Sequence, residues 1–224
     1  MPVIAIASEL AGDGEEIARQ VATRLGLSFL DHSNVLDRLS AHGYSLSEFA
    51  QFQNHRDATP EKSWQLRKIG KIISSEILFL AQKNSMMLHS PYAPYLLTGV
   101  SHIPRIQVRT PSLQRAINYA AAHACDEAHA LERIRNYDHR EAYILDNYFG
   151  VEIPGHTDYF DLVADTGWLS ATDWVDQILD LVRDPDFEAT AESRTKLRAL
   201  AAAAACSNSS NACGNNAGGV AANC

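Results

Sequence analysis

Apolar residues along the chain fall into short runs that alternate with stretches of helical spacing. The first run, residues 3–7, is rich in β-branched side chains and is typical of a strand buried on both faces. A turn with Gly12 and Gly14 follows, and then apolar residues recur at helical intervals up to Leu25, where Gly26 ends the pattern. A strand, a glycine turn and a helix in this order open a βαβ unit.

The same alternation continues to about residue 183. Apolar runs predict four further strands, at residues 27–30, 86–89, 106–109 and 159–164. Helical patterns lie between and after them, at residues 35–39, 64–83, 110–123, 126–148 and 171–183. Five strands that alternate with helices indicate an α/β fold with three layers, in which helices flank a five-stranded parallel sheet.

Two segments depart from this alternation. Residues 41–63 are polar, with a short helix predicted near residues 46–52. At the other end, residues 184–204 are rich in alanine and are predicted to form a helical extension. Residues 205–224 contain almost nothing to bury and are predicted to be a disordered low-complexity tail. The main domain is therefore predicted to span residues 1–183.

The net charge of −8 and the pI near 5.5 narrow the choice of partners. A surface of this sign does not attract nucleic acid or anionic lipid, so neither is predicted as a partner. The first residues are predicted to form a strand and not a signal peptide, and no apolar run is long enough for a membrane span. Of the four cysteines only Cys125 lies in the main domain, which favours a reducing cytoplasm. Cys125 and His129 lack further ligands at zinc spacing, so no metal site is predicted among the cysteines and histidines.

Gly12 and Gly14 are the first candidates for chemistry. A phosphate loop needs glycine so that the backbone can turn tightly and aim its N–H groups at phosphate oxygens, while the following helix adds its positive dipole. The predicted phosphate-binding residues are Ser8, Gly12, Asp13, Gly14, Glu15, Glu16 and Ile17. The alternative is that the two glycines only shape a tight turn between a strand and a helix.

Acidic residues stand where a standard P-loop has a lysine and a hydroxyl. After Gly14 come Glu15 and Glu16, and Asp13 precedes it. Like charges 4 Å apart repel by about 4 kcal/mol at an effective dielectric of about 20, which opposes phosphate binding. Either Mg²⁺ bridges a carboxylate to the phosphates, or the acidic side chains point to solvent, as first-turn acids of helices commonly do. We favour the second arrangement.

An ordered series of motifs resembles the cytidylate-kinase-like family. These motifs are Ile4-Ala5-Ile6-Ala7-Ser8, Gly12-x-Gly14-x-Glu16-Ile17-Ala18, Leu25-Gly26-Leu27-Ser28-Phe29-Leu30-Asp31, residues 105–115, Asp138-x-Arg140-x-x-Tyr143 and Tyr159-Phe160-Asp161-Leu162-Val163. The resemblance covers about residues 2–183. It implies a P-loop nucleoside monophosphate kinase-like fold with a helical acceptor-side insert at residues 32–83 and a lid-like region at residues 120–158.

The resemblance also implies a reaction and its residues. It implies ATP-dependent transfer of the γ-phosphoryl group to a pyrimidine nucleoside monophosphate, with ATP and Mg²⁺ as cofactors and a small-molecule nucleotide as partner. By this resemblance Arg115 is the lid arginine, Arg140 is the arginine two residues beyond Asp138, and Asp31 serves the acceptor. These three are the predicted catalytic residues. His89 and Asp138 are further pocket candidates, because His89 ends a strand where parallel sheets bind ligands.

Departures from the family pattern leave a second function open. A second family arginine falls at Asn118, and His32 replaces the arginine expected beside Asp31. The alternative is a catalytically inactive relative that acts as a nucleotide-binding or protein-interaction module, with a protein as its partner. Several arginines or lysines that converge on residues 12–14 would favour the enzyme, whereas an acidic rim would favour the inactive relative.

Overall fold

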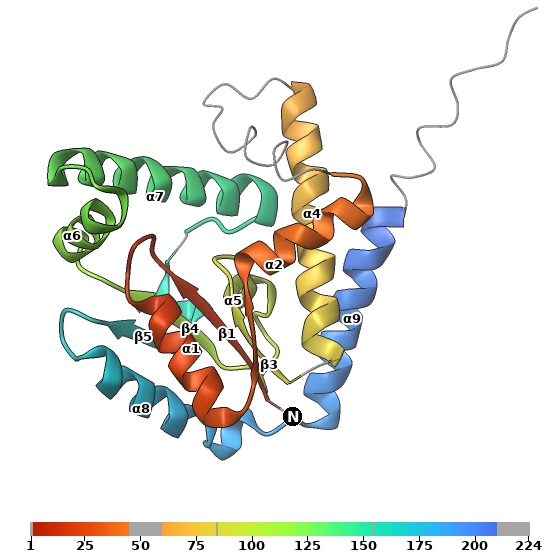
Figure 1. Cartoon of the computed structure of the whole chain (residues 1–224). Coiled ribbons are helices and arrows are strands. Elements are labelled where there is room, and N and C mark those ends of the chain that lie inside the picture. The colour runs from red at the N-terminus through yellow and green to blue at the C-terminus, as the bar shows by residue number, and fades with distance from the viewer. Residues whose placement is uncertain (1, 45–59, 84, 154, 210–224) are drawn as a thin grey trace, which may run out of the picture.

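The computed structural model describes residues 2–44, 60–83, 85–153 and 155–209. At its centre lies a sheet in the order β2-β3-β1-β4-β5, and all neighbouring strands in it are parallel. The strands are β1 (Val3–Ser8), β2 (Ser28–Asp31), β3 (Met86–His89), β4 (Arg105–Arg109) and β5 (Leu162–Asp165). Figure 1 shows helices on both sides of this sheet. The predicted α/β fold with a five-stranded parallel sheet is confirmed.

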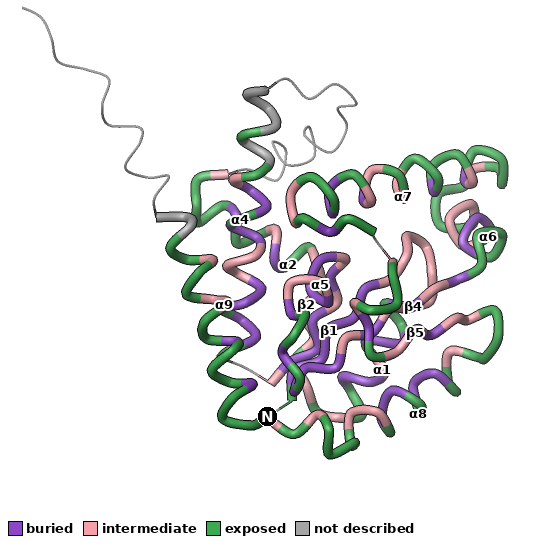
Figure 2. Tube along the Cα trace, turned by 180° about the vertical axis from the view of Figure 1, so that it is seen from behind, coloured by how far each residue is buried: buried purple, intermediate pink, exposed green. Residues whose placement is uncertain are grey.

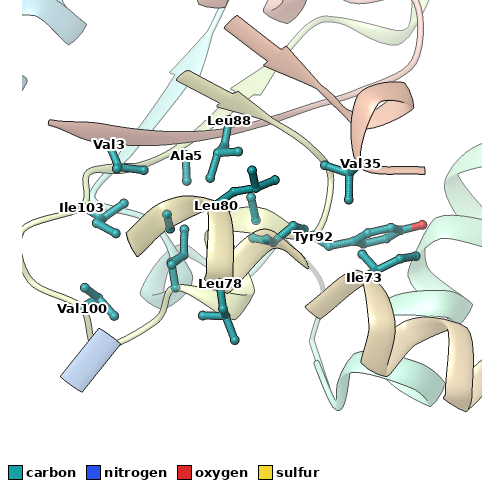
Figure 3. Close-up of a cluster of buried hydrophobic side chains, with 14 of the residues drawn as sticks. Val3, Ala5, Val35, Ile73, Leu78, Leu80, Leu88, Tyr92, Val100 and Ile103 are labelled. Atoms are coloured by element: carbon teal, nitrogen blue, oxygen red, sulfur yellow. The ribbon is translucent and has the colours of Figure 1, made fainter. Parts of the chain in front are cut away.

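Side chains of β1 alternate between the two faces of the sheet, which is why this strand is apolar throughout. Ile4 and Ile6 belong to one core cluster, and Val3 and Ala5 belong to another. The helices that cover the two faces are α1 (Gly14–Leu25), α8 (Ala171–Val182), α4 (Pro60–Lys83) and α5 (Ala93–Leu96). Helices α1 and α8 pack on the face of Ile4, and α4 and α5 pack on the face of Val3. Figure 3 shows the second cluster, with Leu80 of α4 beside Ala5.

Helices α6 (Ser112–His123) and α7 (Glu127–Phe149) form a helical hairpin across one end of the sheet (Figure 1). They pack on each other through Ala116, Ala130 and Ile134. The side chain of Asp126 caps α7 by accepting a hydrogen bond from the N–H of His129 at 2.8 Å. The helix predicted at residues 126–148 is confirmed, with Asp126 as its N-cap.

The alanine-rich segment forms helix α9 (Ala191–Ser209), which lies beside α4 (Figure 1). Leu197 of α9 is only 4 % exposed and belongs to the core cluster of α4. The extension is therefore packed on the rest of the molecule. Among the described residues no helix is both long enough and apolar enough to cross a membrane. The remaining short elements are α2 (His32–Asp37) and the 3₁₀ helices η1 (Arg38–His42), η2 (Thr157–Tyr159) and η3 (Pro185–Phe187).

Two predicted boundaries were wrong. The last strand was predicted to begin at residue 159, but that residue ends η2 and β5 begins at Leu162. The side chain of His156 caps η2 by accepting the N–H of Asp158 at 3.4 Å, and this local bond favours a turn over a strand. Disorder was predicted from residue 205, but residues 205–209 continue α9, because a preceding run of alanine strongly favours helix.

Two further predictions fall outside the described residues. The helix predicted near residues 46–52 is one of them. The other is the low-complexity tail beyond residue 209.

Candidate functional site

The turn between β1 and α1, residues 9–13, is a close-packed glycine loop. A Cβ atom on Gly14 would lie 2.1 Å from the Cβ of Ser8, and a Cβ atom on Gly12 would lie 2.8 Å from the Oγ1 of Thr110. Non-bonded atoms do not approach so closely, so both positions require glycine. Ala11 adopts a left-handed φ of 58°, which costs a residue with a side chain roughly 1–2 kcal/mol. The loop thus holds a strained backbone in a tight space.

Two side chains of α6 hold backbone carbonyl groups of the glycine loop. The Nε of Arg115 donates a hydrogen bond to the carbonyl of Leu10 at 2.8 Å, and the Nδ2 of Asn118 donates to the carbonyl of Ala11 at 3.0 Å. Asn118 takes the place of a family arginine, and here it binds the loop directly. These contacts orient the peptide groups of the loop before any ligand arrives.

Thr110, just after β4, holds the loop from another side. Its Oγ1 accepts the N–H of Asp13 at 3.1 Å, and its own N–H donates to the carboxylate of Glu9 at 2.8 Å. The hydroxyl of Thr166, after β5, lies 3.1 Å from the same Oγ1. The ends of β1, β4 and β5 are therefore joined around the glycine loop.

Arg115 is buried beneath this loop and paired with Asp138 of α7. It is 3 % exposed, and its two terminal nitrogens donate to the two carboxylate oxygens of Asp138 at 2.9 and 2.7 Å. Such a bidentate pair is a strong, directional contact. The structure therefore brings these two predicted residues together, and the hydrogen bonds of the guanidinium go to Asp138 and Leu10. A role of Arg115 on phosphate stays a prediction.

The two glutamates in the first turn of α1 interact with residues one turn further along the helix. Arg19 donates from Nε and Nη2 to the carboxylate of Glu15 at 2.9 and 2.8 Å, and Gln20 donates to Glu16 at 2.8 Å. The side chain of Glu15 is 56 % exposed. Both glutamates thus lie along the exposed surface of α1, which is the arrangement favoured from the sequence.

The first turn of α1 has no side-chain cap. Asp13 occupies the N-cap position, but its side chain makes no capping hydrogen bond. The N–H groups of Gly14, Glu15 and Glu16 therefore have no acceptor within the helix. Together with the positive end of the helix dipole they suit an anion, and phosphate binding here stays a prediction. Ile17 is completely buried and anchors this turn in the core.

His89 and Ser8 lie side by side at the carboxyl ends of β3 and β1. The Nε2 of His89 is 2.8 Å from the Oγ of Ser8. Burial lowers the pKa of His89, although the charges of Glu15 and Asp31 raise it in part. The ring is therefore neutral at pH 7 and can orient the Ser8 hydroxyl beside the glycine loop. Two predicted site residues meet here, although the sequence analysis did not pair them.

Asp31 is a helix cap. Its carboxylate accepts the N–H of Asn34 at 3.0 Å and the hydroxyl of Ser33 at 2.6 Å. The N–H of Asp31 in turn donates to the Oδ1 of Asn34 at 3.1 Å, which completes a capping box. Burial raises the pKa of Asp31, but these hydrogen bonds together with the charge of Arg19 outweigh it and leave the pKa below its usual value. An aspartate with a lowered pKa is a weak general base.

Polar side chains of α7 are buried around Tyr92, which follows β3. Glu141 is 9 % exposed, and burial raises its pKa to about 7 although the charge of Arg140 lowers it. Burial also raises the pKa values of Tyr92 and Tyr137. The guanidinium carbon of Arg140 lies 5.1 Å from the centre of the Tyr137 ring. The predicted residue Arg140 thus belongs to this group, which we call the α7 cluster (Tyr92, Tyr137, Arg140 and Glu141).

His32 reaches the α7 cluster from the start of α2. Its ring stands edge-on to Tyr92, with the ring centres 5.0 Å apart. Its Nδ1 lies 3.2 Å from the hydroxyl of Ser90, while its Nε2 is shielded from solvent and has no hydrogen-bond partner among the described residues. Burial lowers the pKa of His32 to about 4, so the ring is neutral. A ligand can reach this shielded Nε2 atom only if a neighbouring side chain moves.

Sequence reasoning missed several residues of this site. Thr110 joins the loop to β4, Arg19 pairs with Glu15, and Tyr92 and Glu141 form the centre of the α7 cluster. A signal existed for Glu141, since it follows Asp138 by three positions and so shares its side of a helix. No local pattern marked the others, because their partners lie far away in the sequence.

A family model accounts for the order of these motifs. The model of the cytidylate kinase-like family matches residues 3–167. The chain belongs to this family. The resemblance drawn from the sequence motifs is therefore confirmed, and the chain is a nucleotide-kinase-like protein. Helices α8 and α9 lie beyond the matched residues. A search of curated proteins finds no match to the chain.

Solved structures show the same fold at low sequence identity. An uncharacterized protein from Eubacterium ventriosum is 14 % identical with a TM-score of 0.58, covering 81 % of this chain and 97 % of its own. Shikimate kinase from Bacteroides thetaiotaomicron is 7 % identical with a TM-score of 0.53, covering 82 % of this chain and 99 % of its own. Shikimate kinase from Acinetobacter baumannii, solved in complex with shikimate, is 14 % identical with a TM-score of 0.50, covering 81 % and 93 %. These likenesses identify a P-loop kinase fold.

Proposed function

We propose that the chain binds ATP at the glycine loop and transfers its γ-phosphoryl group to a small acceptor, a pyrimidine nucleoside monophosphate. The observation that carries this proposal is the packing of the loop. No Cβ atom fits at Gly12 or Gly14, and the amides that open α1 have no side-chain cap. A backbone held in this way, with unpaired N–H groups at a helix start, suits phosphate oxygens.

At the glycine loop the carboxylate of Asp13 is the candidate ligand for Mg²⁺. Glu9 accepts the N–H of Thr110 and Glu15 is bound by Arg19, whereas Asp13 makes no capping contact. No group of three or more acidic, histidine or cysteine side chains that could hold a metal occurs in the described part of the chain. This fits an ion held mainly by phosphates and water, as Mg²⁺ commonly is at kinase sites. When bound, the ion neutralises charge on the phosphates; Asp13 would be its protein ligand.

The acceptor is proposed to bind between Asp31 and the α7 cluster. Ionised Asp31 can accept a hydrogen bond from a sugar hydroxyl. Arg140 carries positive charge, and the shielded Nε2 of His32 offers a further polar contact. The two shikimate kinases of the same fold act on a different acceptor, so shikimate belongs in the test beside nucleotides.

Trp168 is a candidate platform for the base of the triphosphate. Its side chain is 83 % exposed, and it lies two residues beyond Thr166, whose hydroxyl bonds Thr110 at the glycine loop. Stacking of a base on an aromatic ring contributes about 1–3 kcal/mol. Nucleotide should therefore quench the fluorescence of Trp168, and Trp168→Phe should remove that change while the buried Trp174 still reports the fold.

A second candidate function is binding without catalysis. The observation that favours it is the pairing of Arg115 with Asp138, because it engages a cation that a kinase would direct at the transferred phosphate. Under this proposal ATP binds the loop, but no acceptor is phosphorylated.

Thermal unfolding with ligands at about 1 mM tests both functions. A ligand at 100 times its dissociation constant stabilises the native state by about 2.7 kcal/mol, a shift of several degrees. Stabilisation by Mg·ATP or Mg·CTP and also by CMP, dCMP or shikimate supports the kinase, and a phosphoryl-transfer assay on that pair then separates it from the inactive binder. No shift with any nucleotide contradicts both.

A charge variant locates the bound triphosphate. Glu15→Gln removes a negative charge beside the loop and should tighten ATP binding about twofold to tenfold, as expected for one partly screened charge. Glu127→Gln, in the first turn of α7, is the matched control and should leave the affinity unchanged. Equal effects of the two variants would place the triphosphate elsewhere.

A further inference from the structure

A basic pocket lies at the amino-terminal edge of the sheet. Its volume is about 400 Å³, within the range of about 300–1,000 Å³ that is typical of small-molecule sites. Its wall is formed by Val3 at the start of β1, the end of α4, the segment before β4, and α9. β1 has six residues with a rise of about 3.3 Å between neighbours, so its two ends are about 16 Å apart. The pocket is thus separate from the glycine loop.

The charges that line this pocket are all positive. They are Lys83 at the end of α4, and Arg194 and Arg198, which lie four residues apart on α9 and so share one side of it. None of the three forms an ion pair with a carboxylate among the described residues. Lys83 Nζ also lies 3.9 Å from the centre of the Phe79 ring. In a protein with a net charge of −8, three cations around one pocket create a local positive potential that attracts anions.

His102 is a polar group in the same wall that lacks a partner. The residue is 8 % exposed, and its Nδ1 is shielded from solvent without a hydrogen-bond partner in the described part of the chain. Burial lowers the pKa of His102, and the charge of Arg194 lowers it further. The ring is therefore neutral. Buried polar atoms are nearly always hydrogen-bonded, so a water, or a ligand after a small movement of the ring, can supply the partner that this atom lacks.

The wall that carries the two arginines is held rigidly. Leu197, between them on α9, is 4 % exposed and packs in the core cluster of α4. At the start of α9 the side chains of Thr190 and Ser193 exchange hydrogen bonds with each other's N–H groups, each at 3.1 Å. Figure 2 shows the outer side of α9 exposed beside α4. Arg194 and Arg198 are thus presented on an ordered, accessible helix.

We propose that this pocket binds a small molecule with two or more phosphate groups. The planar forks of Arg194 and Arg198 match phosphate oxygens in pairs, and Lys83 adds a point charge. Three positive charges balance a pyrophosphate group better than a single carboxylate. The apolar side chains of Val3 and Leu197 then contact the organic part of the ligand, and His102, which lies near Arg194, faces the phosphate groups. Because α9 lies beyond the matched family residues, this site would be a property of the extension.

Calorimetric titration of the full chain with inorganic pyrophosphate, without divalent metal, tests the proposal. The double variant Arg194→Gln/Arg198→Gln should bind pyrophosphate at least about tenfold more weakly, because it loses charge-assisted hydrogen bonds. The control Arg133→Gln/Arg135→Gln on α7 removes the same net charge and should bind as the wild type does. Equal weakening in both variants, or none in the first, overturns the proposal.

The ring of His102 provides a second readout that needs no variant. In the wild type its imidazole NMR signals should shift on addition of pyrophosphate with the same apparent affinity as the calorimetry. Signals that stay unchanged while pyrophosphate binds would show that the anion occupies only the glycine loop, and would overturn the proposal.

Discussion

At the carboxyl edge of the sheet Arg115 is 3 % exposed, and Asp138 binds both of its terminal nitrogens. At the amino edge, in contrast, Arg194 and Arg198 are exposed beside a pocket. The first arginine holds together α6, α7 and the glycine loop. The other two have no described carboxylate near enough for an ion pair. The same side chain thus stabilises the fold at one edge and stays available to a ligand at the other.

This difference affects how phosphate can be bound at each edge. At the glycine loop the hydrogen bonds of Arg115 are used within the protein, so the proposed binding would rest on backbone amides and the dipole of α1. At the amino edge the proposed binding would rest on side-chain charge. Binding at the amino edge should therefore fall more steeply with salt than binding at the loop.

The largest loss of stability is expected for Arg115→Met. It removes two hydrogen bonds to Asp138, which is 43 % exposed and stays hydrated, and one to the carbonyl of Leu10. At about 1–1.5 kcal/mol for each bond, it should lower the free energy of unfolding by about 3–4 kcal/mol. Urea unfolding measures this loss. The control is Arg183→Met, whose ion pair with Asp180 is exposed and should contribute less than about 1 kcal/mol. A loss below about 1 kcal/mol for Arg115→Met would mean that Arg115 does not hold the carboxyl edge together.

The next largest loss of stability is expected for Gly14→Ala. The new Cβ would lie 2.1 Å from that of Ser8, and overpacking of this kind costs about 3 kcal/mol at the upper end of its usual range. The opposite change in the same loop, Ala11→Gly, relieves a left-handed φ and should alter stability by less than about 1 kcal/mol. Chemical denaturation of both variants checks the pair. Equal stability of Gly14→Ala and wild type would show that the loop is less tightly packed than described.

Glu141→Gln should change the pH dependence of the free energy of unfolding by roughly 2–3 kcal/mol. Folding raises the pKa of Glu141 from 4.5 to about 7, so the native state binds a proton that the unfolded chain releases between these values. The stability that Glu141 contributes is therefore full below pH 4.5 and is lost as the pH rises to about 7. The groups that face it are Arg140, Tyr92, Tyr137 and Asp138.

The measured quantity is the difference in free energy of unfolding between the wild type and the glutamine variant from pH 4.5 to 8. Taking the difference removes the titration of His32, whose lowered pKa acts in the opposite direction. A difference that does not change with pH would show that Glu141 is ionised throughout.

The smallest change in stability is expected for Arg198→Ala, measured in phosphate-free buffer. Arg198 lies four residues from Arg194, and like charges at this spacing repel by about 0.2–0.5 kcal/mol. The variant should therefore keep or slightly raise stability, in contrast to Arg115→Met. Thermal unfolding measures the change, and a loss above about 1 kcal/mol would mean that Arg198 already has a stabilising partner within the protein.

Local features of the chain were predictable because their partners are near in sequence. The caps at Asp31 and Asp126 bond to amides three positions later. The glycines of the loop and the apolar strands follow from backbone geometry and the period of side chains. Their order was enough to predict the parallel sheet and the family, both of which are confirmed.

The contacts that define the site were not predictable in this way. Ser8 and His89 are 81 positions apart, and Asn118 and the carbonyl of Ala11 are 107 apart. Which side chains meet across such distances depends on the strand order β2-β3-β1-β4-β5 and on where α7 crosses the sheet. Arg115 was predicted as a site residue because it resembles a family arginine. Its pairing with Asp138 became visible only in the folded chain.

The sequence by itself thus determined the elements, their parallel arrangement and the need for glycine at positions 12 and 14, because these depend on local periodicity and on backbone sterics. Only the tertiary structure decided which charges form ion pairs with carboxylates and which do not. It buries Arg115 against Asp138 and leaves Lys83, Arg194 and Arg198 around a pocket. The physical reason is that the strength of a charge interaction depends on burial and on the distance to its partner, and both are properties of the packed molecule.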